Sequence, residues 1–343
     1  MEVRTMFETD TKSTPFVIDE QEFPRSRATV DKLKFLLRYA VLAPSSYNTQ
    51  PWKFSVSDQE IHVYCDKSRW LRIADPEQRE LHINVGCALE NFLIAAEHFE
   101  FGHQLAYFPE PEHEEYAVRV SIVTPRKSSA PRDPSLFSAI PKRCTNHKQY
   151  HRHKPPPEAV EKLRDCLVEE HVYLELTDDW DIKQKIDELV VHGDAVLFAD
   201  RAYREELDYW IRKEGYGTPG LMGKIGQLAM AYMNVVEEQA KQDSEILISS
   251  PFLGVLSSKS DTRADRVKVG QIFERLWLTA TNLGLSLHPM NQVVEVPEIR
   301  DELKNIMPGL REHPMIVFRM GYADEEDIRT PRRPLAEMLI KEI

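Results

Sequence analysis

The sequence predicts a mixed helix–strand protein built from two similar halves, and three observations support this. Helical and strand patterns alternate from about residue 30 onward. Two segments of the first half recur in the second half. Between the halves, residues 124–135 are rich in proline, serine and basic residues and are the best linker candidate. A chain of 343 residues is long enough for one large domain or two smaller ones.

The first half reads as helix, two strands, helix and strand. Residues 30–42 carry an apolar stripe at helical spacing. Residues 52–65 alternate between apolar and polar side chains, like two short strands joined by a polar turn. Residues 79–99 read as a long helix because apolar side chains recur on one face, and residues 116–123 read as a strand.

The second half repeats two of these segments at different offsets. Residues 160–167 resemble residues 30–37, which lie 130 positions earlier, and residues 263–280 resemble residues 79–96, which lie 184 positions earlier. The offsets differ by 54 residues, so the second half carries an insertion of about that size within residues 180–255.

The longer repeat aligns Gly270 with Gly86 and Glu274 with Glu90. A glycine inside a helix costs on the order of 1 kcal/mol relative to alanine. Finding glycine at the matching place in both helices therefore predicts a close approach of another helix at both positions. Chance similarity between two amphipathic helices is the alternative explanation.

The insertion reads as helices on either side of a glycine-rich stretch, residues 215–223, which is mobile by composition. An insertion of this kind is either extra packing or a cover over a site. Within it, Gly215–Gly220 formally matches the GxGxxG fingerprint of dinucleotide-binding proteins. That fingerprint needs a strand before it, whereas here a helix precedes it and Pro219 lies inside it, so a helix–helix connection is the better interpretation.

The composition is that of an ordinary globular protein, with 42% hydrophobic and 29% charged residues. A formal net charge of −12 argues against a general nucleic-acid surface, although it allows a local basic patch. We find no apolar run of about 18 residues that could span a membrane, and no signal peptide at the N-terminus. The four cysteines are scattered, which favours reduced thiols and a cytoplasmic location.

Three histidines, His147, His151 and His153, lie close together in the sequence. Metal sites use closely spaced histidines. Here basic residues surround them and no carboxylate lies among them, so a solvated basic loop is the preferred interpretation over a metal site.

The segment APSSYNTQPW, residues 43–52, follows the first predicted helix and leads into a strand. Its serine, asparagine and backbone N–H groups suit a flat ligand with polar edges, and its apolar flanks could bury a ring face. A capped helix end before a strand would use the same residues. On the segment alone the two interpretations are equally good.

A helix followed by APSSxNxQPW and a strand resembles the nitroreductase-like flavoprotein family, in which this segment touches FMN bound mainly by the other subunit of a homodimer. A second FMN signature of that family, Arg-Arg-Ser-x-Arg, has no convincing counterpart in the first half. In the second half, KRCTNHKQY places Arg143, Thr145 and His147 at the three spaced positions. The chain most resembles the Acg-like branch, which has two lobes, an Arg-x-Thr-Asn segment after the linker and a TPRRP-like tail.

The resemblance implies an α+β fold, an α/β sandwich of nitroreductase type, with two lobes fused into an intrachain pseudo-dimer. The first lobe would span residues 28–123, residues 124–135 would be the linker, and the second lobe would span residues 136–343 with the helical insertion at about 180–255. One flavin site would be kept and the symmetric one lost. A monomer is therefore possible, and a homodimer is also compatible with the sequence.

The resemblance also implies a cofactor site made by both lobes. Lobe one would face the flavin ring and ribityl chain, and a stretch after the second repeated helix would pass flavin N5 and O4 with its backbone N–H groups. Arg143 would bind the phosphate, Thr145 would give a hydroxyl contact, and two late arginines would add charge. His147 replaces an arginine of the family, so its contact would be weaker or pH-dependent. The residues of this predicted site are Pro44, Ser45, Ser46, Asn48, Arg143, Thr145, His147, Pro289, Met290, Asn291, Arg332 and Arg333.

The function that the resemblance implies is an FMN-dependent oxidoreductase, with no catalytic side chain because the flavin carries the hydride chemistry. NAD(P)H would reduce the flavin, and a nitroaromatic, quinone or similar small acceptor would reoxidise it in ping-pong order. An Acg-like flavin store, with the insertion acting as a lid that blocks nicotinamide, is the alternative. A flavin-free scaffold is a third interpretation.

Overall fold

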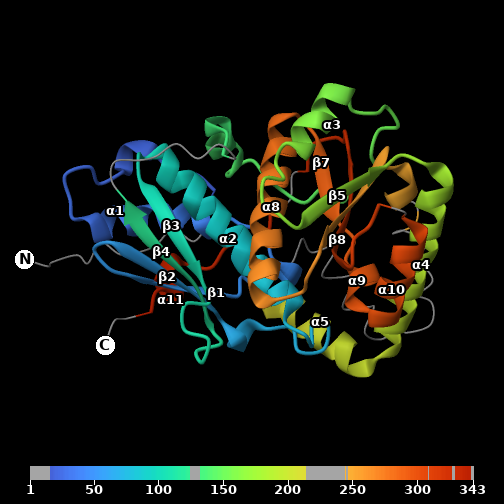
Figure 1. Ribbon diagram of the computed structural model, residues 1–343, viewed down its shortest axis with the longest axis horizontal. Coiled ribbons are helices and arrows are strands. Elements are labelled where there is room, and N and C mark those ends of the chain that lie inside the picture. Colours follow the sequence, from blue (N-terminus) through green and yellow to red (C-terminus); the bar gives the residue numbers. More distant parts are fainter. Residues whose placement is uncertain are drawn as a thin grey trace, which may run out of the picture.

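The computed structural model describes residues 16–123, 132–213, 244, 246–307, 309–326 and 329–340. Most of the linker candidate and the glycine-rich stretch with its GxGxxG match lie outside the described residues. The described part contains two four-stranded antiparallel sheets with helices packed against them, so the fold is α+β, as expected (Figure 1).

The sheet of the first lobe has the strand order β1-β2-β4-β3. Its strands are β1 (Trp52–Val56), β2 (Glu60–Cys65), β3 (Gly102–Tyr107) and β4 (Tyr116–Val123). Burial alternates along β1 and β2, as expected when one face of an antiparallel sheet packs on a core. That core lies against α1 (Thr29–Ala40) and α2 (Arg79–His98). Three short 3₁₀ helices also belong to this half: η1 (Glu20–Glu22), η2 (Ser46–Asn48) and η3 (Lys67–Arg69).

The sheet of the second lobe has the order β5-β6-β8-β7, so first, second, fourth and third strands are neighbours in both sheets. Its strands are β5 (Val172–Thr177), β6 (Phe252–Ser258), β7 (Ser286–Pro289) and β8 (His313–Gly321). The other elements of this half are η4 (Pro134–Ala139), α3 (Pro157–Arg164) and α8 (Arg263–Asn282). The shared strand order agrees with the repeats found in the sequence.

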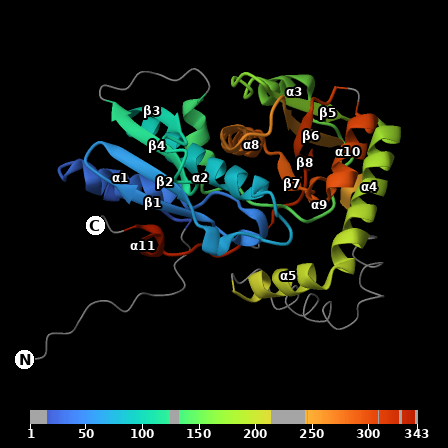
Figure 2. The ribbon, with the colours of Figure 1, turned by 60° about the horizontal axis from the view of Figure 1, so that its bottom comes forward.

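The two long repeated helices, α2 and α8, lie side by side between the sheets (Figures 1 and 2). A Cβ added to Gly86 would overlap the carbonyl oxygen of Val267, and one added to Gly270 would overlap that of Ile83. Both contacts reach the carbonyl three residues before the partner glycine, so the crossing has approximate two-fold symmetry. The close helix approach predicted from the repeated glycines is confirmed.

Part of the insertion forms α4 (Trp180–Ala199) and α5 (Arg201–Lys213). α4 packs against α9 (Gln292–Glu295) and α10 (Pro297–Ile306) of the second lobe, whereas α5 contacts η2 of the first lobe (Figure 2). Residues 252–255, expected as the end of the insertion, are strand because they pair with β8 and, from residue 253 onward, also with β5.

The chain returns to the first lobe after β8, so its C-terminal part crosses the molecule (Figure 1). The short helix α11 (Leu335–Met338) packs against β1, and the N–H of Ile340 donates to the carbonyl of Phe54 at 2.8 Å. Each lobe is therefore tied to the other by α5 and by this tail.

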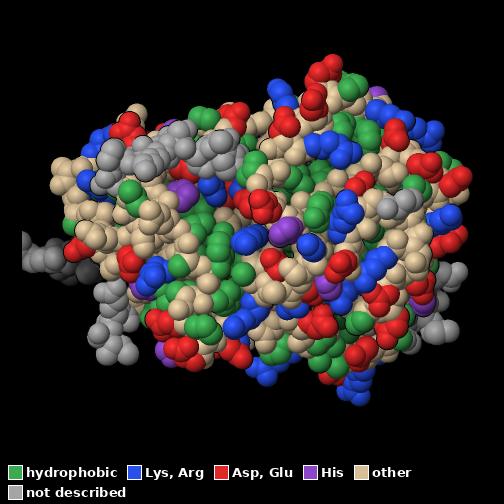
Figure 3. Space-filling model, in the orientation of Figure 1, with side chains coloured by type: hydrophobic (Ala, Val, Ile, Leu, Met, Phe, Trp, Pro, Cys, Tyr) green, Lys and Arg blue, Asp and Glu red, His purple; other side chains and the backbone are tan. Residues whose placement is uncertain are grey.

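No helix in the part of the chain that the structure describes is long and apolar enough to cross a membrane. On the face drawn in Figure 3, acidic and basic side chains are interspersed over the second lobe. This face offers no large area of a single charge for a nucleic acid.

The glycine crossing predicts that Gly270→Ala destabilises the protein by about 2–4 kcal/mol, because the new Cβ overlaps backbone that cannot rotate away. The free energy of unfolding in urea measures this. Without the close crossing, alanine would stabilise the helix by about 1 kcal/mol, so a stabilised variant would contradict the account.

Candidate functional site

The loop after α1 has an unusual backbone. Tyr47, Asn48 and Gln50 have positive φ angles of 48°, 54° and 48°, although none of them is glycine. Such conformations are uncommon and cost free energy, and they persist only where the surrounding structure holds them. The left-handed residues fall inside the APSSYNTQPW segment that the sequence singled out.

The C-terminal tail holds this loop in place. The Asn48 side-chain amide donates to the carbonyl of Pro331 at 2.9 Å, and its oxygen accepts a hydrogen bond from Arg332 at 3.1 Å. The backbone N–H of Arg333 donates to the side-chain oxygen of Gln50 at 2.9 Å, and its guanidinium donates to the Gln50 carbonyl at 3.1 Å. The structure therefore brings Asn48, Arg332 and Arg333 together, as the predicted site requires.

Arg143 approaches the same loop from the second lobe. Its Nη2 lies 3.5 Å from the carbonyl oxygen of Leu42, to which Arg332 also donates, at 3.2 Å. The guanidinium of Arg143 lies 4.5 Å above the ring of Trp277, and only 3% of the residue is exposed. Its Nε and Nη1 have no hydrogen-bond partner within the described part of the molecule.

The guanidinium groups of Arg143 and Arg332 thus converge on one carbonyl oxygen. That of Arg143 is buried and still has two N–H donors without a partner among the described residues. Buried polar atoms without partners are rare in native proteins and call for a ligand or another explanation. Arginine binds phosphate oxygens in pairs through its planar fork. The residues present at this place therefore fit a phosphate group.

Glu274 lies behind Arg143 and is fully buried, with its Oε1 3.7 Å from the Nε of Arg143. Neither carboxylate oxygen has a well-formed hydrogen bond among the described residues. Burial raises the pKa of Glu274 to about 7, although Arg143 and an interaction with the Asn91 side chain act in the opposite direction.

The repeat-related residue Glu90 has the opposite environment. It is equally buried but accepts from Arg275 at 2.8 Å and from Arg132 at 2.9 Å. Burial opposes its ionisation, but the two arginines outweigh burial and lower the pKa of Glu90 to about 2. Arg275 also forms a bidentate pair with Glu169, at 3.0 and 2.8 Å. One of the two related positions is closed by ion pairs, and the other keeps an arginine with unused donors.

Ser46 and Asn291 are joined by a carboxylate that the sequence analysis did not identify. Glu80 of α2 accepts from the Ser46 hydroxyl at 2.5 Å and from the Asn291 side-chain amide at 3.0 Å. The Ser46 N–H donates to Asn84 at 3.3 Å. Further buried acids surround Glu80, and burial raises the pKa of Glu295 well above its usual range.

Four further residues of the predicted site, Pro44, Ser45, Pro289 and Met290, make mainly structural contacts within the described part of the chain. The Ser45 hydroxyl accepts the N–H of Gln50 at 2.9 Å, next to Pro44. Met290 is buried and its N–H donates to the Val317 carbonyl, and Pro289 has no N–H. The expectation of several available backbone N–H groups at residues 289–291 therefore reduces to that of Asn291.

Thr145 and His147 lie on the side facing β7. Thr145 forms an isolated bridge with Leu287, and the His147 ring lies 4.4 Å from that of His288. Burial lowers the pKa of His147, and Arg319 acts in the same direction while Glu326 opposes it. A lowered pKa disfavours the charged phosphate contact that the resemblance implied.

Arg319 was missed in the sequence, although a lone arginine in the apolar strand HPMIVFRMG was a usable signal. It is fully buried and donates to the carbonyls of Lys148 and Asn146 at 3.0 and 2.8 Å. It also lies 3.8 Å above the ring of Tyr150. Arg319 therefore fixes the segment that follows Arg143.

The insertion covers part of the loop. The hydroxyls of Tyr47 and Tyr203 of α5 lie 2.7 Å apart. Glu206 of α5 accepts the successive backbone N–H groups of residues 72–74, at 2.7, 3.1 and 3.0 Å. Three consecutive N–H groups around a carboxylate form an anion-binding nest, so Glu206 fastens α5 to the first lobe.

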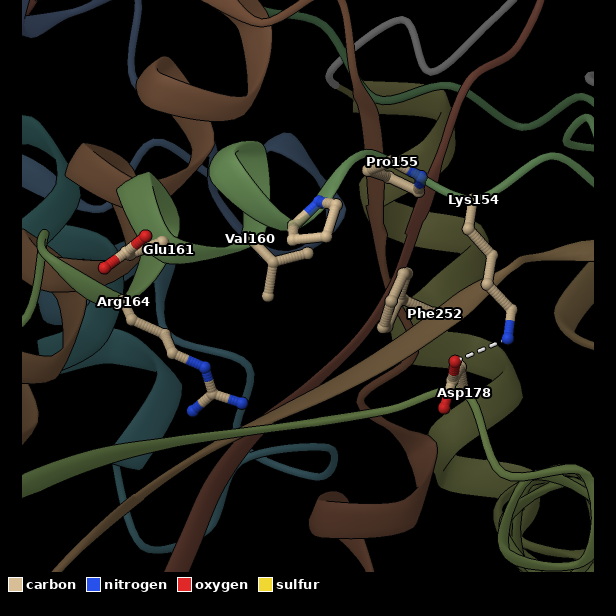
Figure 4. A pocket seen from close by; sticks show the side chains of 8 residues that line it. Lys154, Pro155, Val160, Glu161, Arg164, Asp178 and Phe252 are labelled. Atoms are coloured by element: carbon tan, nitrogen blue, oxygen red, sulfur yellow. Dashed lines mark hydrogen bonds and ion pairs between the residues drawn. The ribbon is translucent and has the colours of Figure 1, made fainter.

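A pocket of about 510 Å³ lies elsewhere, beside α3 (Figure 4). Its lining includes an exposed ion pair between Lys154 and Asp178 and none of the predicted site residues. Among the described residues, no group of three or more His, Cys, Asp or Glu side chains is arranged to hold a metal ion.

The contrast between the related glutamates gives a prediction of opposite sign. Glu90→Gln should lower the free energy of unfolding by about 3 kcal/mol at about pH 8, because it removes the negative charge that two buried arginines share. Glu274→Gln should raise it by about 1–3 kcal/mol at the same pH. The folded-state pKa of Glu274, about 7, lies above the ordinary 4.5, so its ionisation costs stability as the pH rises through that window.

Urea unfolding of both variants at about pH 5 and pH 8 measures these effects, and the gain from Glu274→Gln should shrink at the lower pH. Equal losses for the two variants at both pH values would contradict the assignment of unlike environments.

Proteins named as nitroreductases are similar to this chain in sequence. Residues 18–96 match the family described as "Putative TM nitroreductase". The chain is 24% identical to "Putative NAD(P)H nitroreductase Rv3131" of Mycobacterium tuberculosis, over 90% of this chain and 91% of that protein. It is also 24% identical to "Putative NAD(P)H nitroreductase acg" of the same organism, over 92% of this chain and 97% of that protein.

Among solved structures, the FMN-dependent nitroreductase NfnB of Mycobacterium smegmatis in complex with NADPH is 14% identical, with a TM-score of 0.42. The match covers 61% of this chain and 98% of that one. From the family match and the two relatives, the predicted resemblance to nitroreductase-like proteins is confirmed, and the chain is similar along most of its length to the Acg-named protein.

Proposed function

We propose that this chain binds one FMN between its lobes and acts as an FMN-dependent oxidoreductase of nitroreductase type. The observation that carries the proposal is the buried Arg143, which keeps two donors without a partner among the described residues and shares the Leu42 carbonyl with Arg332 beside the strained loop. The names of its relatives support the same function.

In this proposal, Arg143 and Arg332 bind the phosphate through charge-assisted hydrogen bonds, and Arg333 holds the loop through Gln50. Ser45, Ser46 and Thr145 supply hydroxyl groups for the polar edge and the ribityl chain. Since Glu80 fixes the Ser46 side chain and Asn291 together, the two sides of the site keep one relative position.

When bound, FMN would supply hydride transfer between NAD(P)H and a nitroaromatic, quinone or similar acceptor, in ping-pong order. The protein supplies orientation and excludes water, so no side-chain nucleophile or acid–base pair is required. A small-molecule acceptor and a cytoplasmic location belong to the same proposal.

One site per chain follows from the unequal repeat. At the position related to Glu274, the ion pairs of Glu90 with Arg132 and Arg275 occupy the arginine donors. No second subunit is needed to complete the remaining site, because its residues come from both lobes of one chain. A monomer is thus sufficient in this proposal.

The first test is the visible spectrum of the purified protein, with Arg143→Ala beside it. We expect absorbance near 450 nm, and we expect Arg143→Ala to bind FMN about 10–100-fold more weakly, because a charged hydrogen-bond donor contributes about 1.5–3 kcal/mol. Arg329→Ala is the control, since that exposed arginine donates to the carbonyls of Pro141 and Lys142 instead. Full FMN affinity in Arg143→Ala would refute the phosphate assignment.

A flavin store is the second candidate, and the contacts of α5 favour it. If α5 keeps nicotinamide from the ring, loosening its attachment should speed reduction by NADPH. Glu206→Ala removes the carboxylate that accepts the backbone N–H groups of residues 72–74. Glu205→Ala is the control, since Glu205 pairs with Arg201 on α5 itself.

Anaerobic bleaching of the flavin by NADPH, followed by stopped flow, separates the two functions. The oxidoreductase proposal predicts bleaching within seconds in the unaltered protein and rates for Glu206→Ala and Glu205→Ala within about threefold of it. A yellow protein that NADPH bleaches only after Glu206→Ala would instead support the store.

A further inference from the structure

The repeated helices α2 and α8 place two buried glutamates at related positions and give them unlike partners. Glu90 is held by two arginines at 2.8 and 2.9 Å, whereas the one ion pair of Glu274 within the described part of the chain is with Arg143, at 3.7 Å. A buried carboxylate normally needs close donors, so the incomplete pairing of Glu274 calls for an explanation. A symmetric structural role would have produced similar partners at both places.

We infer that Glu274 is a positioning residue that couples phosphate binding at Arg143 to proton uptake. With a phosphate on Arg143, Glu274 carries a proton; when Glu274 ionises, it competes for the guanidinium and loosens the phosphate. The inference rests on the proposed FMN site and concerns how that site holds its ligand.

Among the described residues, Arg143 is the cation that forms an ion pair with Glu274. The Arg143 side chain lies between Glu274 on its Nε side and the Leu42 carbonyl on its Nη2 side, while Trp277 covers one face. A ligand on the guanidinium is therefore placed where the charge of Glu274 acts through the same group. Both side chains are almost completely removed from water, which leaves this interaction poorly screened.

The charged and titratable groups facing Glu274 come from three other segments. Arg143 follows η4, Arg332 belongs to the tail, and Glu90 and Cys87 belong to α2. Glu90 is ionised, and its charge is balanced by its own two arginines. Burial raises the pKa of the Cys87 thiol well above its usual range, so that thiol stays neutral. The balance at the site therefore depends on two arginines, Glu274 and the ligand.

Charge balance sets the direction of the coupling. Two guanidinium charges offset a phosphate dianion when Glu274 is protonated, whereas an ionised Glu274 leaves one buried negative charge in excess. Binding of the dianion should therefore raise the pKa of Glu274 further, and by linkage a rising pH should weaken binding. The phosphate itself loses its second proton near pH 6, so above about pH 7 its charge no longer changes.

FMN and riboflavin binding to the flavin-free protein, followed by fluorescence between about pH 6.5 and 8.5, tests the inference. We expect FMN affinity to fall about tenfold across this range in the unaltered protein, and less than about threefold in Glu274→Gln. Riboflavin lacks the phosphate, so its affinity should change less than about threefold in both proteins. The same pH profile for FMN in both proteins would overturn the inference and leave the FMN site in place.

A second measurement needs no variant. Calorimetry at about pH 7.5 in two buffers of different ionisation enthalpy counts the protons exchanged on binding. We expect proton uptake with FMN and none with riboflavin, and no uptake with FMN would overturn the inference. A protein that binds no FMN at any pH would overturn both the inference and the proposed function.

Discussion

The backbone contact between Gly86 and Gly270 is the constraint on which the rest of the structure depends. It lets α2 and α8 cross with their backbones in contact, and it brings the two sheets to opposite sides of one helix pair. Only glycine allows this approach, since any Cβ would overlap a carbonyl of the other helix. The lobes therefore share one core, and groups from both can meet across it.

The function that we propose depends on a difference between the two repeated helices. The same helix positions carry Glu90 and Glu274, but the arginines that reach them differ in number and distance. Closing one position with ion pairs stabilises the core, while the other keeps a buried guanidinium with unused donors. The tail and α5 then cross between the lobes and hold the strained loop beside that guanidinium.

The sequence was informative wherever a local pattern decided the structure. The expected helices at 30–42 and 79–99 correspond to α1 and α2 within two residues at each end, and the repeated glycines meet as predicted. β3 was not anticipated, because GHQLAY has no clear apolar alternation and becomes a strand by pairing with β4. The roles of Glu80 and Glu274 could not be foreseen, because their partners lie far away in the sequence and no spacing rule connects them. The resemblance, rather than periodicity, pointed to Arg143 and the tail.

The central claim is a single flavin held between the two lobes of one chain, and native mass spectrometry of the protein saturated with FMN tests it most directly. The account predicts one FMN for each 39.8 kDa chain, including in any monomeric species. Two FMN molecules per chain, or one that is bound only when two chains associate, would contradict it.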